Sequence, residues 1–223
     1  MAPSLLTPLQ SEVLTAFFAQ ETRFYLSGGA ALAGFLLAHR RTHDLDLFTT
    51  TEALLDGERL LKAVAANLGV TFELRQSSPD FRRALLRRGD EALVIDLVRD
   101  RAIQGALPKL SFDAIRVDSP QEILANKLCT LLSRSELRDL VDVRALELAG
   151  FRIEDALPLA QLKDGGLTPA QLGWVLSEVK LEGPPHAKIV LEGSDEGMPT
   201  LGEMTAFLAD LTRRLVAMSR PKT

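Results

Sequence analysis

From Tyr25 to Phe48 the chain reads YLSGGAALAGFLLAHRRTHDLDLF, its most informative stretch. A short apolar strand runs into two glycines, an apolar segment follows, and a basic patch then leads to Asp44 and Asp46. Residues two apart on a strand point to the same side, so both carboxylates are expected to project together. Glycine-rich turns approach phosphates, and an aspartate pair holds divalent metal beside them. The stretch therefore indicates a nucleotide-handling protein.

Composition describes an ordinary globular chain of 223 residues, with 46% hydrophobic and 25% charged residues. The net charge of -4 excludes a global positive field that would recruit nucleic acid, so any such contact needs a local basic patch. Cys129 is the only cysteine, which excludes an internal disulfide and a cysteine zinc cluster. The N-terminus lacks signal-peptide features, and the longest apolar run, Ala30 to Ala38, is too short to span a bilayer. We expect a cytoplasmic protein without a membrane partner.

Periodicity divides the chain into an α/β half, residues 1–118, and an all-helical half, residues 119–223. In the first half we expect a turn at Gly28-Gly29, helices at 8–20, 30–38 and 52–67, and strands at 24–27, 44–49, 70–75, 81–87, 92–99 and 112–117. In the second half we expect helices at 120–133, 136–149, 153–162, 169–181 and 202–219, with loops at 183–185 and 192–199.

Asp44, Asp46 and Asp96 are the candidate metal ligands. Two adjacent carboxylates resist joint ionisation unless a cation neutralises them, and Mg²⁺ takes oxygen ligands together with substrate phosphates. Asp96 lies on a separate predicted strand and is the natural third ligand. The alternative is that Asp44 and Asp46 are surface carboxylates paired with Arg40 and Arg41. Taken alone, the pair favours that alternative, because an isolated short motif is only a hypothesis.

The turn Ser27-Gly28-Gly29 is the candidate phosphate site. A turn without Cβ atoms exposes backbone N–H groups, and the helix after it presents further donors. A simple tight turn is the alternative, since a lone Gly-Gly is weak evidence. One helix returning to the sheet would bring the turn and the carboxylates together.

Lys127 stands in the middle of an apolar helical stripe. A buried ammonium needs an anion, either a carboxylate or a substrate phosphate, unless the side chain snorkels to solvent. Asp139 and Asp142 lie three apart on the next predicted helix, where either can act as a general base or orient the substrate. The alternative is an Arg138–Asp142 helix pair.

Two further groups carry weaker signals. His39 and His43 are four apart, but the chain is expected to change from helix to strand between them, which spoils a helical metal pair. Four arginines flank the predicted hairpin and face either RNA phosphates or solvent, and we favour solvent for all of them: Arg82, Arg83, Arg87 and Arg88.

The ordered segments GGAALAG, HRRTHDLDLF, VIDLV, ILANKLCTLLSR and RDLVDV resemble the nucleotidyltransferase-fold proteins of the AbiEii/AbiGii toxin family. The resemblance runs from Tyr25 to about Leu148 and implies an α+β fold. That fold is a minimal polymerase-β-like mixed sheet flanked by helices and followed by an all-helical C-terminal domain.

The resemblance also implies roles for the candidate residues. Asp44, Asp46 and Asp96 are expected to bind Mg²⁺ in a catalytic site. Phosphate binding falls to Gly28 and Gly29, with Ser27 and Arg40 beside them, and Lys127 is expected to contact the nucleotide. Asp139 or Asp142 serves the last family motif, as base. Some family members bind GTP, related toxins add nucleotides to the 3′ end of tRNA, and some are paired with an antitoxin.

One departure matters for function. Many nucleotidyltransferases have a serine directly after the first glycine, and this family often has threonine after the second, but this chain has Gly29 and Ala30. We expect a Mg²⁺-dependent enzyme that transfers a nucleotide from NTP to an RNA or protein hydroxyl. The alternatives are a nucleotide-binding module that has lost turnover and a metal-dependent phosphohydrolase using His39 and His43.

Overall fold

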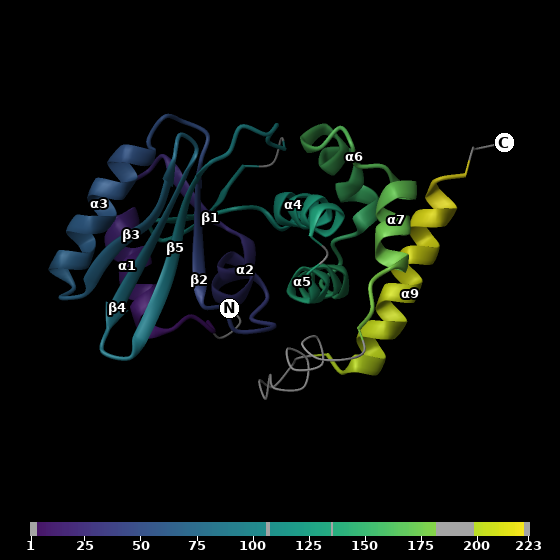
Figure 1. Cartoon of the computed structure of the whole chain (residues 1–223), viewed down its shortest axis with the longest axis horizontal. Helices are drawn as coiled ribbons and strands as arrows, with labels where there is room; N and C mark the ends of the chain where they lie inside the picture. The colour runs from purple at the N-terminus through teal and green to yellow at the C-terminus, as the bar shows by residue number, and fades with distance from the viewer. Residues whose placement is uncertain (1–3, 106–107, 135, 182–198, 221–223) are drawn as a thin grey trace. The chain divides into compact units, whose positions relative to one another are not determined.

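The computed structural model describes residues 4–105, 108–134, 136–181 and 199–220 (Figure 1). The chain divides into two compact units, which we call the sheet unit and the helical unit. The sheet unit comprises Met1–Arg101 and Ala106–Ser119, and the helical unit comprises Ala102–Gly105 and Pro120–Thr223. The loop expected at 183–185, and the loop at 192–199 apart from Pro199, lie outside the described residues.

A seven-stranded mixed sheet forms the centre of the sheet unit, in the order β3-β4-β5-β2-β1-β7-β6. The pairs β2–β5 and β1–β7 are parallel, and the other neighbours are antiparallel. The strands are β1 (Phe24–Ser27), β2 (Asp44–Thr49), β3 (Thr71–Ser78), β4 (Phe81–Arg88), β5 (Glu91–Arg99), β6 (Leu110–Phe112) and β7 (Ile115–Val117).

Of the strand expected at 112–117, β7 (Ile115–Val117) and the last residue of β6 are confirmed, but a turn divides them and makes the segment a hairpin. β6 and β7 pair as antiparallel neighbours, and the chain reverses at Asp113, whose φ is +52°. Aspartate tolerates this left-handed conformation better than most residues do, so a turn fits here without glycine.

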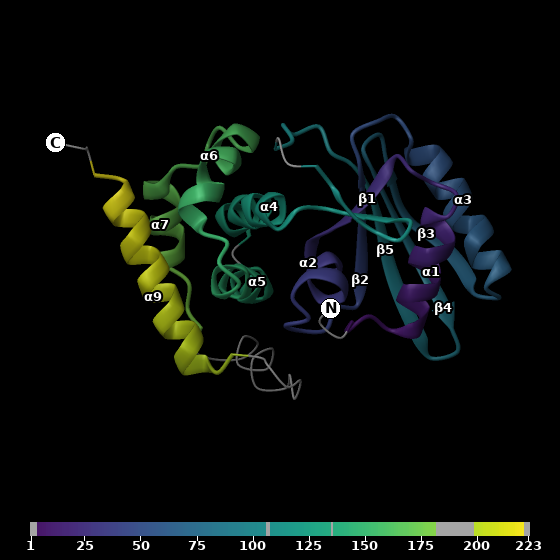
Figure 2. The same ribbon diagram turned by 180° about the vertical axis from the view of Figure 1, so that it is seen from behind.

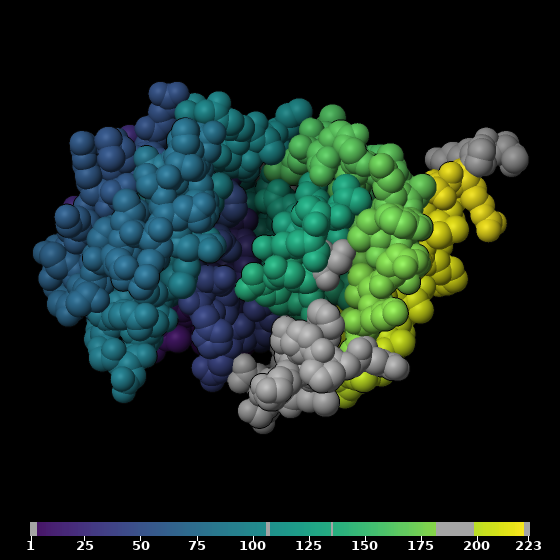
Figure 3. All heavy atoms as spheres, viewed as in Figure 1, coloured from purple at the N-terminus to yellow at the C-terminus, as the bar shows by residue number. Residues whose placement is uncertain are grey.

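One face of the sheet is covered and the other carries the polar residues. Along β2 the side chains alternate, with Leu45 and Leu47 fully buried and Asp44 and Asp46 half-buried. The helices α1 (Pro8–Phe18) and α3 (Leu54–Asn67) pack on the sheet, and α1 lies in front of the strands in Figure 2. The side chains of β3 are mostly exposed, and this edge forms part of the surface in Figure 3. The alternation puts the aspartates on the face opposite the leucines.

The segment after β1 corrects the expected turn and helix. The helix α2 (Gly28–Ala31) starts at the first glycine, and a π-helical turn, η1 (Leu32–Leu36), continues it. Gly28 has φ +65°, which lets the strand pass directly into a helix without an intervening turn. The helix ends earlier than expected because Ala38 has φ +50°. A π turn inside a helix often accompanies a functional site.

The helical unit contains α4 (Pro120–Ser133), α5 (Leu137–Leu148), α6 (Ile153–Lys163), α7 (Pro169–Ser177) and α9 (Leu201–Met218). Helix α4 packs against α5, α6 and α7, and α9 packs against α7 and α5. Helix α7 ends at Ser177, earlier than expected. The α+β fold, a mixed sheet followed by C-terminal helices, is confirmed. Across the described ranges, none of the helices has both the length and the apolar character that crossing a bilayer requires.

Candidate active site

A row of polar residues crosses four neighbouring strands of the sheet. Ser27 on β1 stands opposite Asp46 on β2, Asp46 stands opposite Asp96 on β5, and Asp96 stands opposite Arg83 on β4. Residues paired across neighbouring strands project from the same face of a sheet. The fold therefore brings Asp46 and Asp96, fifty positions apart in sequence, side by side.

Arg83 holds the Asp96 carboxylate with both arms of its guanidinium. Its Nε donates to Oδ1 at 2.8 Å and its Nη2 donates to Oδ2 at 2.6 Å. These hydrogen bonds raise the pKa of Arg83, and the nearby charges of Asp46 and Asp44 raise it further. All three expected metal ligands therefore lie within electrostatic reach of one arginine.

The pattern of the hairpin predicted a solvated strand face for Arg83, so its bond to Asp96 was not expected. The side chain is 46% exposed, yet it is bonded to a carboxylate that is only 11% exposed. A signal was present in the sequence. Counting outward from the two-residue turn Gly89-Asp90 pairs Arg83 with Asp96, provided that the hairpin has no bulge.

The two glycines lie against two of the predicted site residues. A Cβ added to Gly28 would stand 2.5 Å from Asp46 Oδ2, and a Cβ added to Gly29 would stand 2.9 Å from Arg40 Nη2. Both distances are shorter than real Cβ contacts, so the side chains of Asp46 and Arg40 lie this close to the backbone because glycines stand there. The structure thus brings together Gly28, Gly29, Arg40 and Asp46.

Asp44 begins β2 and is anchored from the preceding loop. Thr42 Oγ1 donates to Asp44 Oδ1 at 2.6 Å, and the Thr42 carbonyl accepts a hydrogen bond from buried Gln10 at 3.1 Å. Helix α1 therefore helps to fix the start of the strand that carries both aspartates.

The Ser27 hydroxyl has a partner on the other side of β1. It donates to Asp118 Oδ2 at 2.8 Å, while Lys109 Nζ donates to Asp118 Oδ1 at 2.7 Å. The Lys109 ammonium also lies 4.0 Å from the centre of the Tyr25 ring. Ser27 therefore links β1 to the end of β7, and its assignment to nucleotide binding stays a prediction.

The donor set of the sheet unit suits Mg²⁺ in its chemistry. Asp44 and Asp46 supply oxygen ligands on one face, and Asp46 lies against the backbone of Gly28. Mg²⁺ commonly takes one or two carboxylates together with phosphates. Within the described part of the chain, no group of three or more His, Cys, Asp or Glu side chains is arranged to hold a metal ion. Both carboxylate oxygens of Asp96, the third predicted ligand, accept hydrogen bonds from Arg83.

Lys127, Asp139 and Asp142 form a separate buried cluster in the helical unit. Lys127 Nζ lies 2.6 Å from Asp139 Oδ1 and 2.7 Å from Asp142 Oδ2, and both carboxylates are 0% exposed. Arg134 also bonds to Asp139, at 3.0 Å. Of the two anions expected for the buried lysine, a carboxylate or a substrate phosphate, the structure shows carboxylates, and the side chain does not snorkel to solvent. Arg138, the alternative partner expected for Asp142, forms an ion pair with Glu136 at 2.7 Å.

The charge of Lys127 is stabilised despite its burial. Burial lowers the pKa of the ammonium, but the charges of Asp142 and Asp139 outweigh it, so the net pKa is raised. Lys127 therefore stays protonated at neutral pH. Its expected contact with nucleotide, and the base role of either aspartate, stay predictions.

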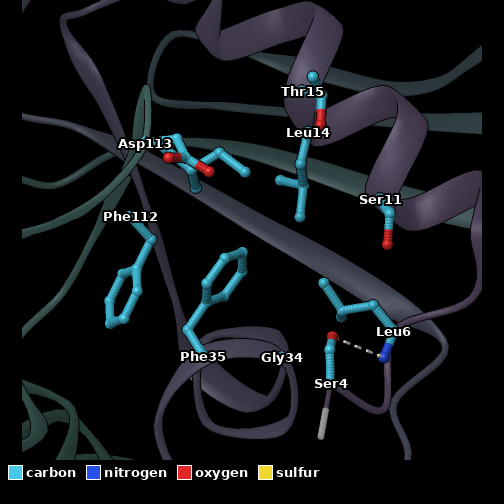
Figure 4. A pocket seen from close by; sticks show the side chains of 10 residues that line it. Ser4, Leu6, Ser11, Leu14, Thr15, Gly34, Phe35, Phe112 and Asp113 are labelled. Atoms are coloured by element: carbon cyan, nitrogen blue, oxygen red, sulfur yellow. Dashed lines mark hydrogen bonds between the residues drawn. The ribbon is translucent and has the colours of Figure 1, made fainter. Parts of the chain in front are cut away.

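A cavity of about 340 Å³ lies elsewhere in the sheet unit, between α1, η1 and the β6–β7 hairpin (Figure 4). Its walls are mainly apolar, with Leu14, Phe35 and Phe112 among them. None of the predicted site residues lines it, so it does not extend the acidic row. His39 and His43 both fall in the loop between η1 and β2.

A mixed sheet with two aspartates on one strand, a third on its parallel neighbour and a glycine pair beside them defines a protein of the nucleotidyltransferase class. The family comparison agrees with this class. Residues 12–173 match the family described as nucleotidyl transferase AbiEii toxin, type IV TA system, so this chain belongs to that family. No curated protein matches the chain.

Solved structures agree on the fold. The crystal structure of JHP933 from Helicobacter pylori is similar with a TM-score of 0.57 and 21% identity, over 95% of this chain and 92% of that chain. MenT4, a nucleotidyltransferase toxin from Mycobacterium tuberculosis, is similar with a TM-score of 0.54 and 16% identity, over 96% of this chain and 83% of that chain.

Proposed function

We propose that this protein is a Mg²⁺-dependent nucleotidyltransferase that moves a nucleotide from NTP to a hydroxyl of RNA, such as a tRNA 3′ end, or of a protein. The observation that carries this proposal is the register that aligns Asp46 with Asp96 beside Gly28. Membership of a nucleotidyltransferase toxin family supports the same chemistry.

In this proposal Asp44 and Asp46 hold the metal ion, and Asp96 joins them when nucleotide is bound. A bound divalent ion neutralises charge on the phosphates and on the leaving pyrophosphate. Gly28 and Gly29 let the triphosphate approach the backbone closely, and Arg40, which lies against Gly29, binds a phosphate oxygen.

The reaction is an in-line substitution at phosphorus. The acceptor hydroxyl oxygen forms a bond to the α-phosphorus, the bond from that phosphorus to the bridging oxygen breaks, and pyrophosphate leaves with the electron pair. The hydroxyl proton passes to a carboxylate or to water. Asp139 and Asp142 are 0% exposed and bonded to Lys127, which favours a role in positioning that lysine over contact with the acceptor.

The decisive experiment incubates the protein with each labelled NTP and total cellular RNA or protein, in Mg²⁺. We expect label in one acceptor fraction and none with Asp46→Ala. Full activity of Asp46→Ala would exclude the role given to this carboxylate.

A second candidate is a nucleotide-binding module without turnover, because Ala30 supplies no hydroxyl to the phosphates. NTP binding in calorimetry without label in any acceptor would favour that candidate. Phosphate released from NTP without transfer would instead indicate a phosphohydrolase.

A toxin role and a genetically linked antitoxin belong to this proposal through the family. Growth arrest on expression of the wild-type chain, but not of Asp46→Ala, would support the toxin role. The cytoplasmic location stays a prediction.

A further inference from the structure

Arg83 and a metal ion compete for the same two atoms. Asp96 stands in the acidic row, but each of its carboxylate oxygens accepts a hydrogen bond from the Arg83 guanidinium. A bidentate arginine neutralises the carboxylate and occupies one lone pair on each oxygen, so it weakens the binding of a metal ion to that carboxylate. In this geometry both oxygens of Asp96 are hydrogen-bonded to the arginine.

Arg83 can leave Asp96 without opening the core. Its side chain is 46% exposed, and the guanidinium rests 5.4 Å from the centre of the Phe81 ring on the same strand. Lys127 differs, because its side chain is 10% exposed and its two carboxylate partners are fully buried. Of the ion pairs at Arg83 and Lys127, the one at Arg83 can exchange partners at the lower cost in free energy, because its cation is the more exposed.

We propose that Arg83 pairs with Asp96 in the nucleotide-free protein and moves to the phosphates of the incoming nucleotide when a divalent ion binds Asp96. The guanidinium fork that fits a carboxylate also fits a phosphate, so the exchange keeps the arginine paired throughout. Arg83 then binds the nucleotide directly and makes metal binding at Asp96 depend on nucleotide. The inference rests on the proposed function, because it assumes that NTP binds beside the acidic row.

The test measures Mn²⁺ binding to the nucleotide-free protein by electron paramagnetic resonance, for wild type and Arg83→Gln. Removing the competing guanidinium should tighten Mn²⁺ binding by about tenfold, since a charge beside a carboxylate alters cation binding by at least that factor. The same variant should bind a non-hydrolysable NTP about tenfold more weakly in Mg²⁺, because a charge-assisted bond to phosphate is lost.

Arg87→Gln is the matched control. Arg87 lies on the same strand and the same face, four residues on, but stands opposite Ala92 instead of a carboxylate. It should change neither Mn²⁺ nor nucleotide binding. In the double variant Arg83→Gln/Asp96→Asn the gain in Mn²⁺ affinity should disappear, because the gain depends on Asp96.

Unchanged or weaker Mn²⁺ binding by folded Arg83→Gln would overturn the inference, and unchanged nucleotide binding would overturn the move to the phosphates. Arg83→Lys keeps the charge but loses the forked guanidinium, so it should give a smaller gain in Mn²⁺ affinity. It replaces the glutamine variant in the test if that variant is unstable. Tighter Mn²⁺ binding in a protein that labels no acceptor would remove the proposed function and leave the competition at Asp96 intact. Transfer activity of the wild type together with unchanged Mn²⁺ binding by Arg83→Gln would support the proposed function and remove the competition at Asp96.

Discussion

The two groups of aspartates in this chain have opposite environments. In the sheet unit Asp44 and Asp46 are half-buried on a strand whose leucines are fully buried, and a partly exposed arginine binds Asp96. In the helical unit Asp139 and Asp142 are fully buried, and Lys127 bonds to both.

The difference indicates a functional role for the aspartates of the sheet unit and a stabilising role for those of the helical unit. The helical cluster balances its charges internally, because Lys127 and Arg134 face the two carboxylates. Removing one partner from such a buried network leaves an uncompensated charge and destabilises the fold. In the sheet row, the charges of Asp96, Asp46 and Asp44 act on Arg83, whose side chain is 46% exposed, so the row lies closer to solvent than the helical cluster. Loss of function without loss of stability should therefore follow changes in the row, and the reverse should follow changes in the cluster.

The largest expected effect belongs to Asp46→Asn. It removes a charged metal ligand and should lower nucleotide transfer by about 10³-fold or more, since metal stabilisation of a transferring phosphoryl group contributes several kcal/mol. The midpoint of chemical unfolding should stay close to that of wild type. Transfer rate and unfolding curves measured together check both halves, and a large loss of stability would contradict the distinction.

Next in size is Lys127→Met, which leaves two buried carboxylates without their shared cation. We expect a loss of about 3–5 kcal/mol in the free energy of unfolding, from the cost of an uncompensated buried charge. Urea unfolding followed by circular dichroism measures it. The double variant Lys127→Met/Asp142→Asn should recover part of the loss, and a Lys127→Met protein as stable as wild type would show that the cluster does not support the fold.

A smaller effect tests the close approach of Asp46 to Gly28. Gly28→Ala strains a backbone at φ +65° and puts a methyl group 2.5 Å from Asp46 Oδ2. Gly69→Ala is the matched control, with φ +66° and no atom within 4 Å of the added carbon. Both should cost about 1–2 kcal/mol of stability from the left-handed backbone. Only Gly28→Ala should also weaken Mn²⁺ binding in titrations, and equal Mn²⁺ affinity in the two variants would count against a site at this place.

The smallest effect is a pH dependence of the helical cluster. The folded pKa of Lys127 is raised above its ordinary value of 10.5, so its stabilisation is complete below that pH and is lost as pH rises through the folded pKa. The difference in unfolding free energy between wild type and Lys127→Met should stay constant from pH 7 to pH 10 and shrink above that. A difference that already shrinks below pH 9 would refute the assigned charge state.

Local patterns predicted much of the fold. The bounds of β1 and β2 match expectation, because strand alternation and the flanking glycines act over a few residues. The expected helix at 30–38 failed because Gly28 starts a helix itself and a π turn follows. No short window shows that a strand passes straight into such a helix.

Partners across the fold were harder to predict. An anion for Lys127 was expected from its place on an apolar stripe, but whether carboxylate or phosphate supplied it depended on how α4 and α5 pack. Asp118 as the partner of Ser27 was not foreseen, since the two residues stand far apart in sequence and meet only through β1 and β7.

The sequence by itself determined that Asp44 and Asp46 share one side of a strand, since alternation is a property of the backbone alone. It also carried the family, through the order of its motifs. Tertiary structure decided that Asp96 stands beside Asp46 and that Arg83 is bonded to it. Those pairings depend on sheet register, which packing and turn geometry set over the whole unit.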